Sequence, residues 1–578
     1  MMPLPAGPKT RALRWLRWMT LLLLPAAAAC AQANPAAPLP GGAGAHSSAE
    51  ATAPEPGSSY VPMGSWIYDA LDRLAAFGLI PSQIAGLRPW TRTECLRQTR
   101  EAEKHFQGSL GRYTSQQMTA DLSAIGVEVA GLISALHREL DSFGLAAPSI
   151  TVQSVYTRNG AIAGPALDDS FHFGQTWTLD NGRPFGRGWN SYTGFTADAG
   201  SGRFVAYMSG EYQHAPGSDP YSLAVREAIS TMDNIPLPPA VARSDTSRFR
   251  AIEAYAGFRL GELEFTAGKQ ALWWGPTYDA PLSFSNNAEP TKNLRISTLH
   301  PIRLWSLAEI RAEFVIGKLG GQQYTWRPWF NAQKLSFKLT DNLEMGFTRW
   351  SIFWGVGHPM TLGSFIDNFA TLNAGVGGRA NPGDRKGGFD FRYRIPGLRN
   401  WLTLYTDSYC DDDPSPLASP HRAAIEPGIY WTHVPGIAHL AFRVEAPSTT
   451  LMGLDNIINY VNYEYLSGNT NYGQLLGSWV GRDGRAEEAW ATYRFSPRNK
   501  IELGFRQLKG SAKLIPGGST QSDLSLESSY ALARDLSADF FAQYEKFYIP
   551  LLGPRRNNLS SWIQLTWEPN LQILQKRN

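Results

Sequence analysis

Cysteine, net charge and long apolar runs are all scarce in this sequence, and each shortage excludes a class of protein. The 578 residues contain three cysteines, none with the C-x-x-C spacing of a zinc or thioredoxin-like site. A disulfide between Cys95 and Cys410 stays open, because the sequence does not fix the distance between them. The 53 lysines and arginines nearly balance the 50 aspartates and glutamates, so we expect no nucleic-acid partner.

Recognisable catalytic motifs are missing as well. The sequence has no G-x-S-x-G, no H-E-x-x-H and no P-loop. Gly375–Gly378 is glycine-rich, but no strand–helix unit surrounds it, so it is not a dinucleotide-binding loop. We therefore predict that the protein is not an enzyme and uses no cofactor.

The first 33 residues have the pattern of a signal peptide. A short apolar core at Met19–Ala29 follows a basic segment, and we predict cleavage after Ala33. Cys30 permits a lipoprotein cleavage instead, but Ala27 stands where a lipobox favours leucine. Beyond residues 1–33 no uninterrupted apolar run reaches about 18 residues, so a mature chain that crosses a membrane does so with strands.

Residues 34–59 and 60–147 differ in composition. The first segment is rich in Ala, Pro, Gly and Ser, and we predict a disordered linker. The second has helical periodicity, with a capping box at Thr91–Glu94 and a long helix from about Ser115 to Phe143. These features predict a small helical bundle. Its first apolar stripe is Ile67, Ala70, Leu71, Leu74 and Phe77.

From about residue 150 the hydrophobic period changes from 3.6 to 2. Apolar and polar residues alternate along Ile252–Leu260, a tight turn follows at Gly261-Glu262, and Leu263–Ala267 continues the alternation. Leu335–Phe347 repeats this pattern around a turn at Asp341-Asn342. These segments predict antiparallel hairpins with one apolar and one polar face.

We predict that residues 148–568 form a large antiparallel transmembrane β-barrel and that residues 569–578 form a tail. Short turns alternate with long polar loops such as 214–247 and 411–424. With roughly 22–24 residues per strand and connection, the region holds about 16–20 strands, with 18 the central value. The 19 tryptophans and 55 glycines suit the aromatic girdles and turns of such a barrel.

Several segments of the chain resemble one known family, including Trp66–Ile80 and Arg88–Cys95 in the helical part and Gly481–Gly484 further on. Gly268–Pro276 contains Trp-Trp-Gly-Pro, and Leu282–Asn287 and Leu294–Ser297 follow it. Asn469–Gly477 reads Asn-Thr-Asn-Tyr-Gly-Gln-Leu-Leu-Gly. These motifs resemble the capsule-assembly family known as Wzi, and the resemblance spans roughly residues 60–567.

The resemblance implies an outer-membrane barrel with a periplasmic helical domain that binds or attaches capsular or extracellular polysaccharide at the cell surface. The implied partners are that polysaccharide, outer-membrane lipid and lipopolysaccharide, and the barrel-insertion machinery. The residues alone leave a porin-like sugar channel open, because a polar lumen fits a pore equally well. An outer-membrane enzyme acting on polysaccharide or lipid is less favoured, since it needs converging catalytic groups.

Trp273, Trp274, Asn286, Asn287 and Arg295 are the candidate polysaccharide-binding residues. Sugar rings stack their C–H faces on aromatic rings, and amide or guanidinium groups hydrogen-bond hydroxyls. Adjacent residues on a strand point to opposite faces, so one tryptophan would face lipid and the other the lumen. The alternative interpretation puts the tryptophans in an interfacial belt and the asparagines in a turn.

Asp411, Asp412 and Asp413 are weak candidates for a metal site. Carboxylate oxygens suit hard cations, but the run lacks the spaced ligands and the glycine of an EF-hand loop. A solvated loop is the favoured interpretation, and we expect no metal.

Overall fold

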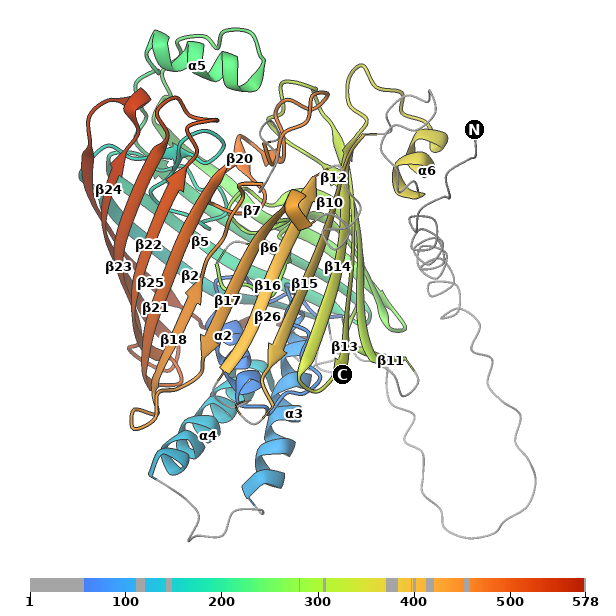
Figure 1. Cartoon of the computed structure of the whole chain (residues 1–578). Helices are drawn as coiled ribbons and strands as arrows, with labels where there is room; N and C mark the ends of the chain where they lie inside the picture. The colour runs from blue at the N-terminus through green and yellow to red at the C-terminus, as the bar shows by residue number, and fades with distance from the viewer. Residues whose placement is uncertain are drawn as a thin grey trace, which may run out of the picture.

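A closed β-barrel is the main feature of the computed structural model (Figure 1). The structure describes residues 57–110, 120–141, 148–279, 281–304, 308–370, 383–396, 398, 402–411, 420–451 and 458–575. The predicted signal peptide, Cys30 and most of the predicted linker lie outside these residues.

The barrel strands occupy most of the chain after residue 148. They are β2 (Ser149–Ile162), β5 (Gly188–Ser201), β6 (Phe204–Ala215), β7 (Thr246–Leu260), β8 (Leu263–Gln270), β10 (Thr291–Thr298), β11 (Ile302–Leu304), β12 (Ala308–Lys318), β13 (Trp329–Thr340), β14 (Leu343–Phe353), β15 (Asp384–Arg394), β16 (Leu402–Asp411), β17 (Ala423–Trp431), β18 (Leu440–Glu445), β21 (Gly484–Ser496), β22 (Asn499–Gly510), β23 (Ser519–Ala531), β24 (Leu536–Tyr548), β25 (Arg556–Trp567) and β26 (Leu571–Gln575).

Short strands and helices accompany the barrel. The strands are β1 (Leu87–Arg88), β3 (Asp168–Asp169), β4 (Gly174–Gln175), β9 (Trp273–Trp274), β19 (Thr470–Asn471) and β20 (Gln474–Leu475). The helices are α2 (Trp66–Ala76), α3 (Arg92–Leu110), α4 (Ala120–Leu140), α5 (Leu223–Asp233) and α6 (Leu362–Ala370), with 3-10 turns η2 (Pro420–Arg422) and η3 (Pro550–Leu552).

Each barrel strand pairs antiparallel with the next barrel strand along the chain, and β2 closes the ring against β25 and β26. β10 and β11 both pair with β12, so they form one interrupted strand, as do β25 and β26 beside β2. Counted in this way, the described residues form an 18-stranded closed barrel. The predicted fold class and strand number are confirmed.

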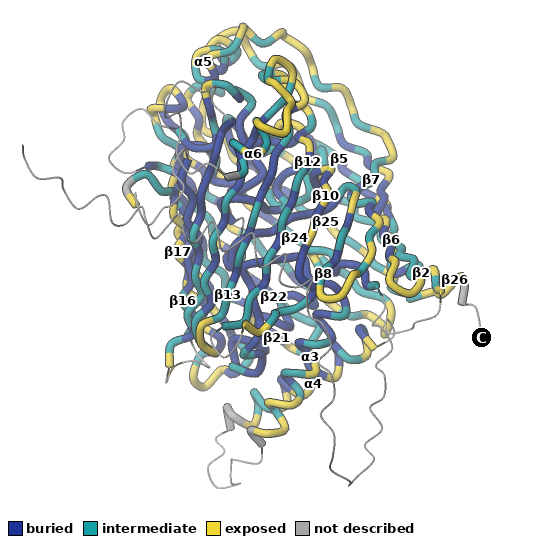
Figure 2. Tube along the Cα trace, turned by 90° about the vertical axis from the view of Figure 1, so that its right-hand side faces the viewer, coloured by how far each residue is buried: buried dark blue, intermediate teal, exposed yellow. Residues whose placement is uncertain are grey.

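The barrel is apolar outside and polar inside. In β17, the exposed residues Ile425, Ile429 and Trp431 alternate with the buried residues Glu426 and Tyr430. Figure 2 shows long exposed stretches at the turns and loops beyond the strands. A sheet that exposes its apolar side chains and buries its carboxylates is unfavourable in water but suits a lipid surround.

The predicted hairpins form as expected, with two differences at their margins. Gly261 has a φ of 59° in the β7–β8 turn, a value that favours glycine. Ile252 was expected on the apolar face, but a register shift between Ser209 and Gly210 leaves it unpaired, and it lies buried. The segment 569–578 was expected to be a tail, but its residues 571–575 form β26, because they continue the pairing with β2.

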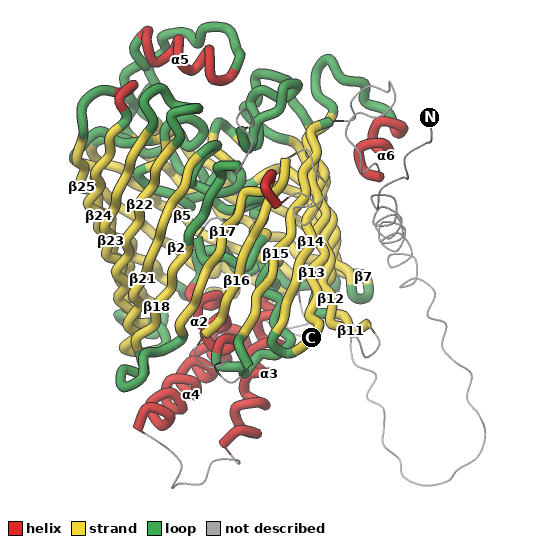
Figure 3. Tube along the Cα trace, viewed as in Figure 1, coloured by secondary structure: helices red, strands yellow, loops and turns green. Residues whose placement is uncertain are grey.

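Three helices form a domain at the end of the barrel where the connections are short, which we call the short-turn end (Figures 1 and 3). Ser65 caps α2 by accepting a bond from Ile67 N–H, and Thr91 caps α3 by accepting one from Glu94 N–H at 3.1 Å. Among the described residues, no helix is both long and apolar enough to cross a bilayer. The shared core includes Leu71, Leu74, Trp90, Leu132 and Leu136.

Buried ion pairs connect the helical domain to the barrel. Asp72 of α2 accepts hydrogen bonds from Arg392 of β15 at 2.6 Å and from Arg443 of β18 at 2.9 Å. Asp69 of α2 accepts a bond from Arg494 of β21 at 2.6 Å. These contacts place α2 within the short-turn end of the barrel.

The opposite end, which we call the loop end, carries the long connections and α5 and α6 (Figure 1). Three segments pack together inside the barrel at this end: residues 163–187, residues 271–290 apart from 280, and residues 458–482. We call them the lumen lid. Their apolar side chains include Phe284, Tyr460 and Leu475, which pack with wall residues in one buried cluster.

Candidate functional site

The Trp273–Trp274 pair lies inside the barrel rather than in its wall. β9 pairs with β1 of the helical domain, so that Trp273 lies opposite Arg88 and Trp274 opposite Leu87. The Trp274 indole N–H donates to Glu313 Oε1 at 2.9 Å. Both tryptophans are buried and neither faces lipid, unlike the expectation, because the chain after β8 turns into the lumen and pairs with the helical domain.

Arg295 and Asn287 are occupied by internal contacts. Arg295 pairs with Glu313 of the neighbouring strand, and its Cζ lies 4.4 Å from the centroid of the Tyr60 ring. Asn287 Nδ2 donates to Leu475 O at 3.1 Å, which joins two segments of the lumen lid. Neither side chain is presented at the surface.

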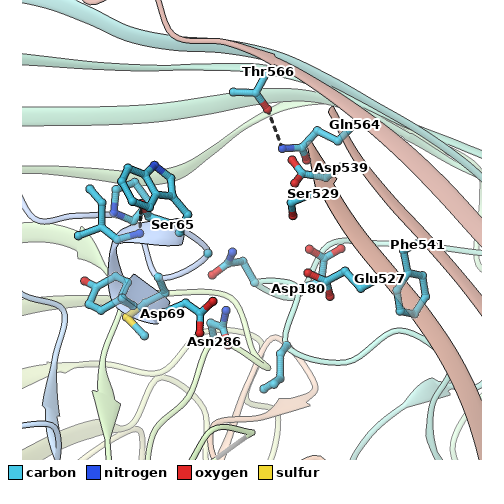
Figure 4. A pocket seen from close by; sticks show the side chains of 18 of the residues that line it. Ser65, Asp69, Asp180, Asn286, Glu527, Ser529, Asp539, Phe541, Gln564 and Thr566 are labelled. Carbon is cyan, nitrogen blue, oxygen red and sulfur yellow. Dashed lines mark hydrogen bonds between the residues drawn. The ribbon is translucent and has the colours of Figure 1, made fainter. Parts of the chain in front are cut away.

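Trp273 and Asn286 both line an internal cavity of about 670 Å³. Figure 4 shows Asn286 at this cavity, together with Asp180 and Phe541. The cavity lies between the helical domain and lumen lid on one side and the barrel wall on the other, from β21 to β25 and on through β2, β5, β6 and β7. Within the described residues, Trp273 Nε1 and Asn286 Oδ1 have no hydrogen-bond partner. Two of the five residues predicted from the sequence, Trp273 and Asn286, therefore lie at the cavity. The other three make structural contacts: Trp274, Asn287 and Arg295.

The cavity wall combines aromatic rings with polar groups. The Phe541 and Trp562 rings stack with centroids 5.5 Å apart, and Arg158 Cζ lies 4.4 Å from the Trp562 ring centroid. Arg158 also bonds to Asp180 at 2.9 Å and to Gln564 at 2.9 Å. Flat apolar faces beside amides and paired charges can bind a polar ring compound such as a sugar.

The Asn469–Gly477 motif holds the lumen lid together. Asn469 Nδ2 donates to Tyr409 Oη at 2.7 Å, which anchors the segment to β16. Asn471 Nδ2 donates to Glu289 O at 2.7 Å, which anchors it to the segment after β9. Most of the motif is structural, but the side chain of Tyr472 is exposed at the surface.

Three aromatic side chains at the loop end are exposed: Trp326 by 53%, Tyr463 by 73% and Tyr472 by 52%. We call them the loop-face aromatic patch. Tyr472 has a φ of 52° and Arg327 one of 56°, conformations that are costly for residues other than glycine. The Arg327 Cζ lies 4.1 Å from the Trp326 ring centroid, so a cation accompanies the patch.

Hydrogen bonds fix the loops that carry this patch to one another. Tyr472 N–H donates to Gly320 O at 2.8 Å, and Thr325 Oγ1 donates to Glu464 O at 2.9 Å. The loop after β12 and the segment after residue 458 therefore form one surface. Sequence reasoning noted the motif around Tyr472 but missed the patch, because exposure depends on how these loops fold together.

His172 lies between two carboxylates where lid segments meet the α5 loop. Its Nδ1 is 2.8 Å from Asp169 Oδ2, and its Nε2 is 2.8 Å from Asp233 Oδ2. Arg482 donates to the other oxygen of Asp233 at 2.7 Å. Burial opposes the charged ring, but the neighbouring carboxylates raise the pKa of His172 to about 9. The charged imidazole therefore ties the α5 loop to the lumen lid.

The aspartate run and the cysteines do not form binding sites in the described structure. Asp411 ends β16 and lies 3.3 Å from Lys386 Nζ, while Asp412 and Asp413 lie outside the described residues. In the described part of the chain, no three His, Cys, Asp or Glu side chains gather as metal ligands. Cys95 and Cys410 are both buried thiols, and no disulfide joins them.

The closed wall of 18 strands with an apolar outer face, filled from one end by helices and from the other by loops, defines an outer-membrane β-barrel protein. The chain belongs to the family of the capsule assembly protein Wzi, whose model matches residues 157–559. Membership of a capsule-assembly family agrees with the prediction that the chain is not an enzyme.

The solved structure of Wzi from Escherichia coli has the same fold, with a TM-score of 0.63 and 14% sequence identity; the alignment covers 89% of this chain and 100% of that one. It is described as an outer-membrane protein involved in group 1 capsule assembly and a carbohydrate-binding β-barrel. An uncharacterized 55.8 kDa protein from the cps region of Klebsiella pneumoniae is 27% identical over 177 residues. That match spans 30% of this chain and 35% of the relative.

Proposed function

We propose that this protein binds capsular or extracellular polysaccharide at the outer face of the outer membrane and holds it there, as a lectin does, without catalysing a reaction. The observation that carries the proposal is the loop-face aromatic patch, whose rings stay exposed on interlocked loops. Exposed aromatic rings offer flat stacking surfaces for sugars, and these three rings lie on loops that hydrogen bonds join to one another.

The proposed orientation puts the loop end outside the cell and the helical domain in the periplasm. Outer-membrane barrels have short periplasmic turns and long extracellular loops, and the helical domain lies at the short-turn end. The apolar strand faces would contact outer-membrane lipid, with lipopolysaccharide around the loop end. The barrel-insertion machinery would place the protein in this membrane.

We favour attachment over a porin-like channel, because side chains fill much of the lumen from both ends. Trp274 and Phe284 of the lumen lid pack in series against Trp350 of β14, and α2 occupies the short-turn end. Planar-bilayer recordings of the purified protein are expected to show little conductance. Large steady conductance steps would favour the channel instead.

A binding assay tests the proposal directly. Surface-immobilised polysaccharide from the encapsulated host is titrated with the purified full chain in detergent, and saturable binding is expected. Trp326→Ala, Tyr463→Ala and Tyr472→Ala together should abolish it. Trp189→Ala is the matched control, since this tryptophan is also exposed at the loop end of a strand but lies outside the patch. Equal binding by the triple variant would contradict the proposal.

A further inference from the structure

The internal cavity extends to the short-turn end, and segments of the lumen lid line it on the side of the loop end. Its lining includes exposed Gly64, Pro497 of the β21–β22 turn and Asn570 near the last strand. At the loop end Gln543 Nε2 donates to Thr176 O at 2.9 Å, which fixes the lid segment to β24. A solute would therefore enter from the helical-domain side, away from the loop-face aromatic patch.

Among the uncharged side chains that line this cavity, three buried polar atoms have no hydrogen-bond partner within the described residues: Trp273 Nε1, Tyr207 Oη and Asn286 Oδ1. Trp273 is 4% exposed, so bulk solvent does not account for its indole N–H. Buried polar groups are nearly always hydrogen-bonded in native proteins. Two donors and an acceptor, together with the Trp562 ring, match the hydroxyls and the C–H face of a sugar.

The charges around the cavity favour an uncharged ligand. The lining contains twelve carboxylate and nine basic side chains. Eight of those nine basic side chains form an ion pair with a lining carboxylate, as Arg494 does with Asp69 and Arg506 with Asp523. The protein's own carboxylates already neutralise these cationic side chains, so an anionic ligand would gain little electrostatic attraction. The carboxylates in excess would also repel it.

We propose that this cavity is a second carbohydrate site, which takes a short uncharged oligosaccharide from the helical-domain side of the barrel. The inference rests on the proposed function for its class of ligand but concerns a different surface. The volume of about 670 Å³ lies within the range of about 300–1,000 Å³ typical of small-molecule sites. Trp273 and Asn286 provide the polar contacts, and the Phe541–Trp562 pair provides the stacking surface.

Calorimetric titration of the full chain in detergent tests this site. The probes are maltotriose and neutral fragments of two to four sugars from partial hydrolysis of the host polysaccharide, with trigalacturonic acid as the anionic comparison. We expect at least one neutral probe to bind at millimolar concentration or below and the anion to bind more weakly. Absence of binding by every neutral probe would overturn the proposal and leave water and ions as the occupants.

Two variants locate the binding. Trp273→Phe keeps the ring but removes the N–H, so we expect affinity about three- to ten-fold lower, whereas Trp431→Phe on the outer face of β17 should have no effect. Ser529→Cys adds a thiol on the cavity wall, and its modification with fluorescein maleimide should block binding. Unchanged binding after both treatments would overturn the site.

The loop-face triple variant separates this inference from the proposed function. It should lose polysaccharide binding yet retain oligosaccharide binding in the cavity. If the triple variant lost both, the cavity would not be an independent site. If it lost neither while Trp273→Phe lost oligosaccharide binding, the cavity site would stand and the surface proposal would fail.

Discussion

Removal of the Asp72 carboxylate is expected to loosen the helical domain from the barrel. Asp72 bonds Arg392 at 2.6 Å and Arg443 at 2.9 Å, and the three side chains are 11%, 11% and 9% exposed. Asp72→Asn leaves two buried guanidinium groups without their counter-charge, and breaking a buried ion pair costs roughly 3–5 kcal/mol. Because the asparagine oxygen can still accept a bond, we expect the lower end, about 3 kcal/mol.

Hydrogen exchange of the α2 amides measures this loss. A decrease of about 3 kcal/mol in the free energy of undocking should speed exchange by roughly 100-fold. Asp141→Asn is the matched control, because it removes an ion pair whose carboxylate side chain is 55% exposed and should change little. Heat-modifiable gel migration confirms that the barrel is intact. An intact Asp72→Asn barrel with wild-type α2 exchange would show that the Asp72 ion pairs do not hold α2 in the barrel.

Three other outcomes are expected, one each at Asp72, His172 and Trp274. Burial would raise the pKa of Asp72, but Arg392 and Arg443 lower it to about 2, below the usual value near 3.9. The contribution of Asp72 to docking of the helical domain is therefore complete above pH 4 and lost as the pH falls through 2. Pepsin should accordingly cleave α2 faster at pH 2 than at pH 4. The pKa of His172 is raised to about 9, so its contribution to stability is complete below about pH 6.5 and lost as the pH rises through 9. Proteolysis of the α5 loop should therefore accelerate between pH 7 and 10 in the wild type but not in His172→Gln. Trp274→Phe removes the hydrogen bond to Glu313 and should lower the free energy of unfolding by about 1.5–3 kcal/mol. Heat-modifiable gels should show this loss as a lower unfolding midpoint. An unchanged midpoint would count against a stabilising role for this bond.

The barrel was predictable because the sequence pattern that specifies each hairpin lies within a short stretch of the chain. Alternation along Ile252–Leu260 and the turn at Gly261-Glu262 define one hairpin, and repetition of such hairpins implies a closed ring in lipid. The helical domain was predictable for the same reason, since the spacing of Ile67 and Leu71 and the cap at Thr91 act within single helices.

The location of the tryptophan motif was not predictable, because it depends on contacts between distant parts of the chain. Trp273 and Trp274 look like strand residues, and they do form a strand, but their partner is Leu87–Arg88 of the helical domain. The alternation rule assigns faces only once the partner is known. Arg295 likewise looked available for sugar, yet Glu313 and Tyr60 occupy it.

The loop-face aromatic patch escaped the sequence for a related reason. Trp326 and Tyr463 lie in connections without regular periodicity, and only the folded loops show which aromatic side chains stay exposed. The motif around Tyr472 was visible, but most of its polar side chains serve the lumen lid. Within such a motif, the exposed residue in a strained conformation is the better functional candidate.

The distribution of polysaccharide between cells and medium tests whether the loop-face aromatic patch holds the polymer at the cell surface. The measurement compares an encapsulated host that carries only the Trp326→Ala, Tyr463→Ala, Tyr472→Ala variant with one that carries the wild type, at equal amounts of heat-modifiable barrel in the outer membrane. We expect the variant to release polymer into the medium while total synthesis stays the same. An unchanged cell-bound fraction would contradict it.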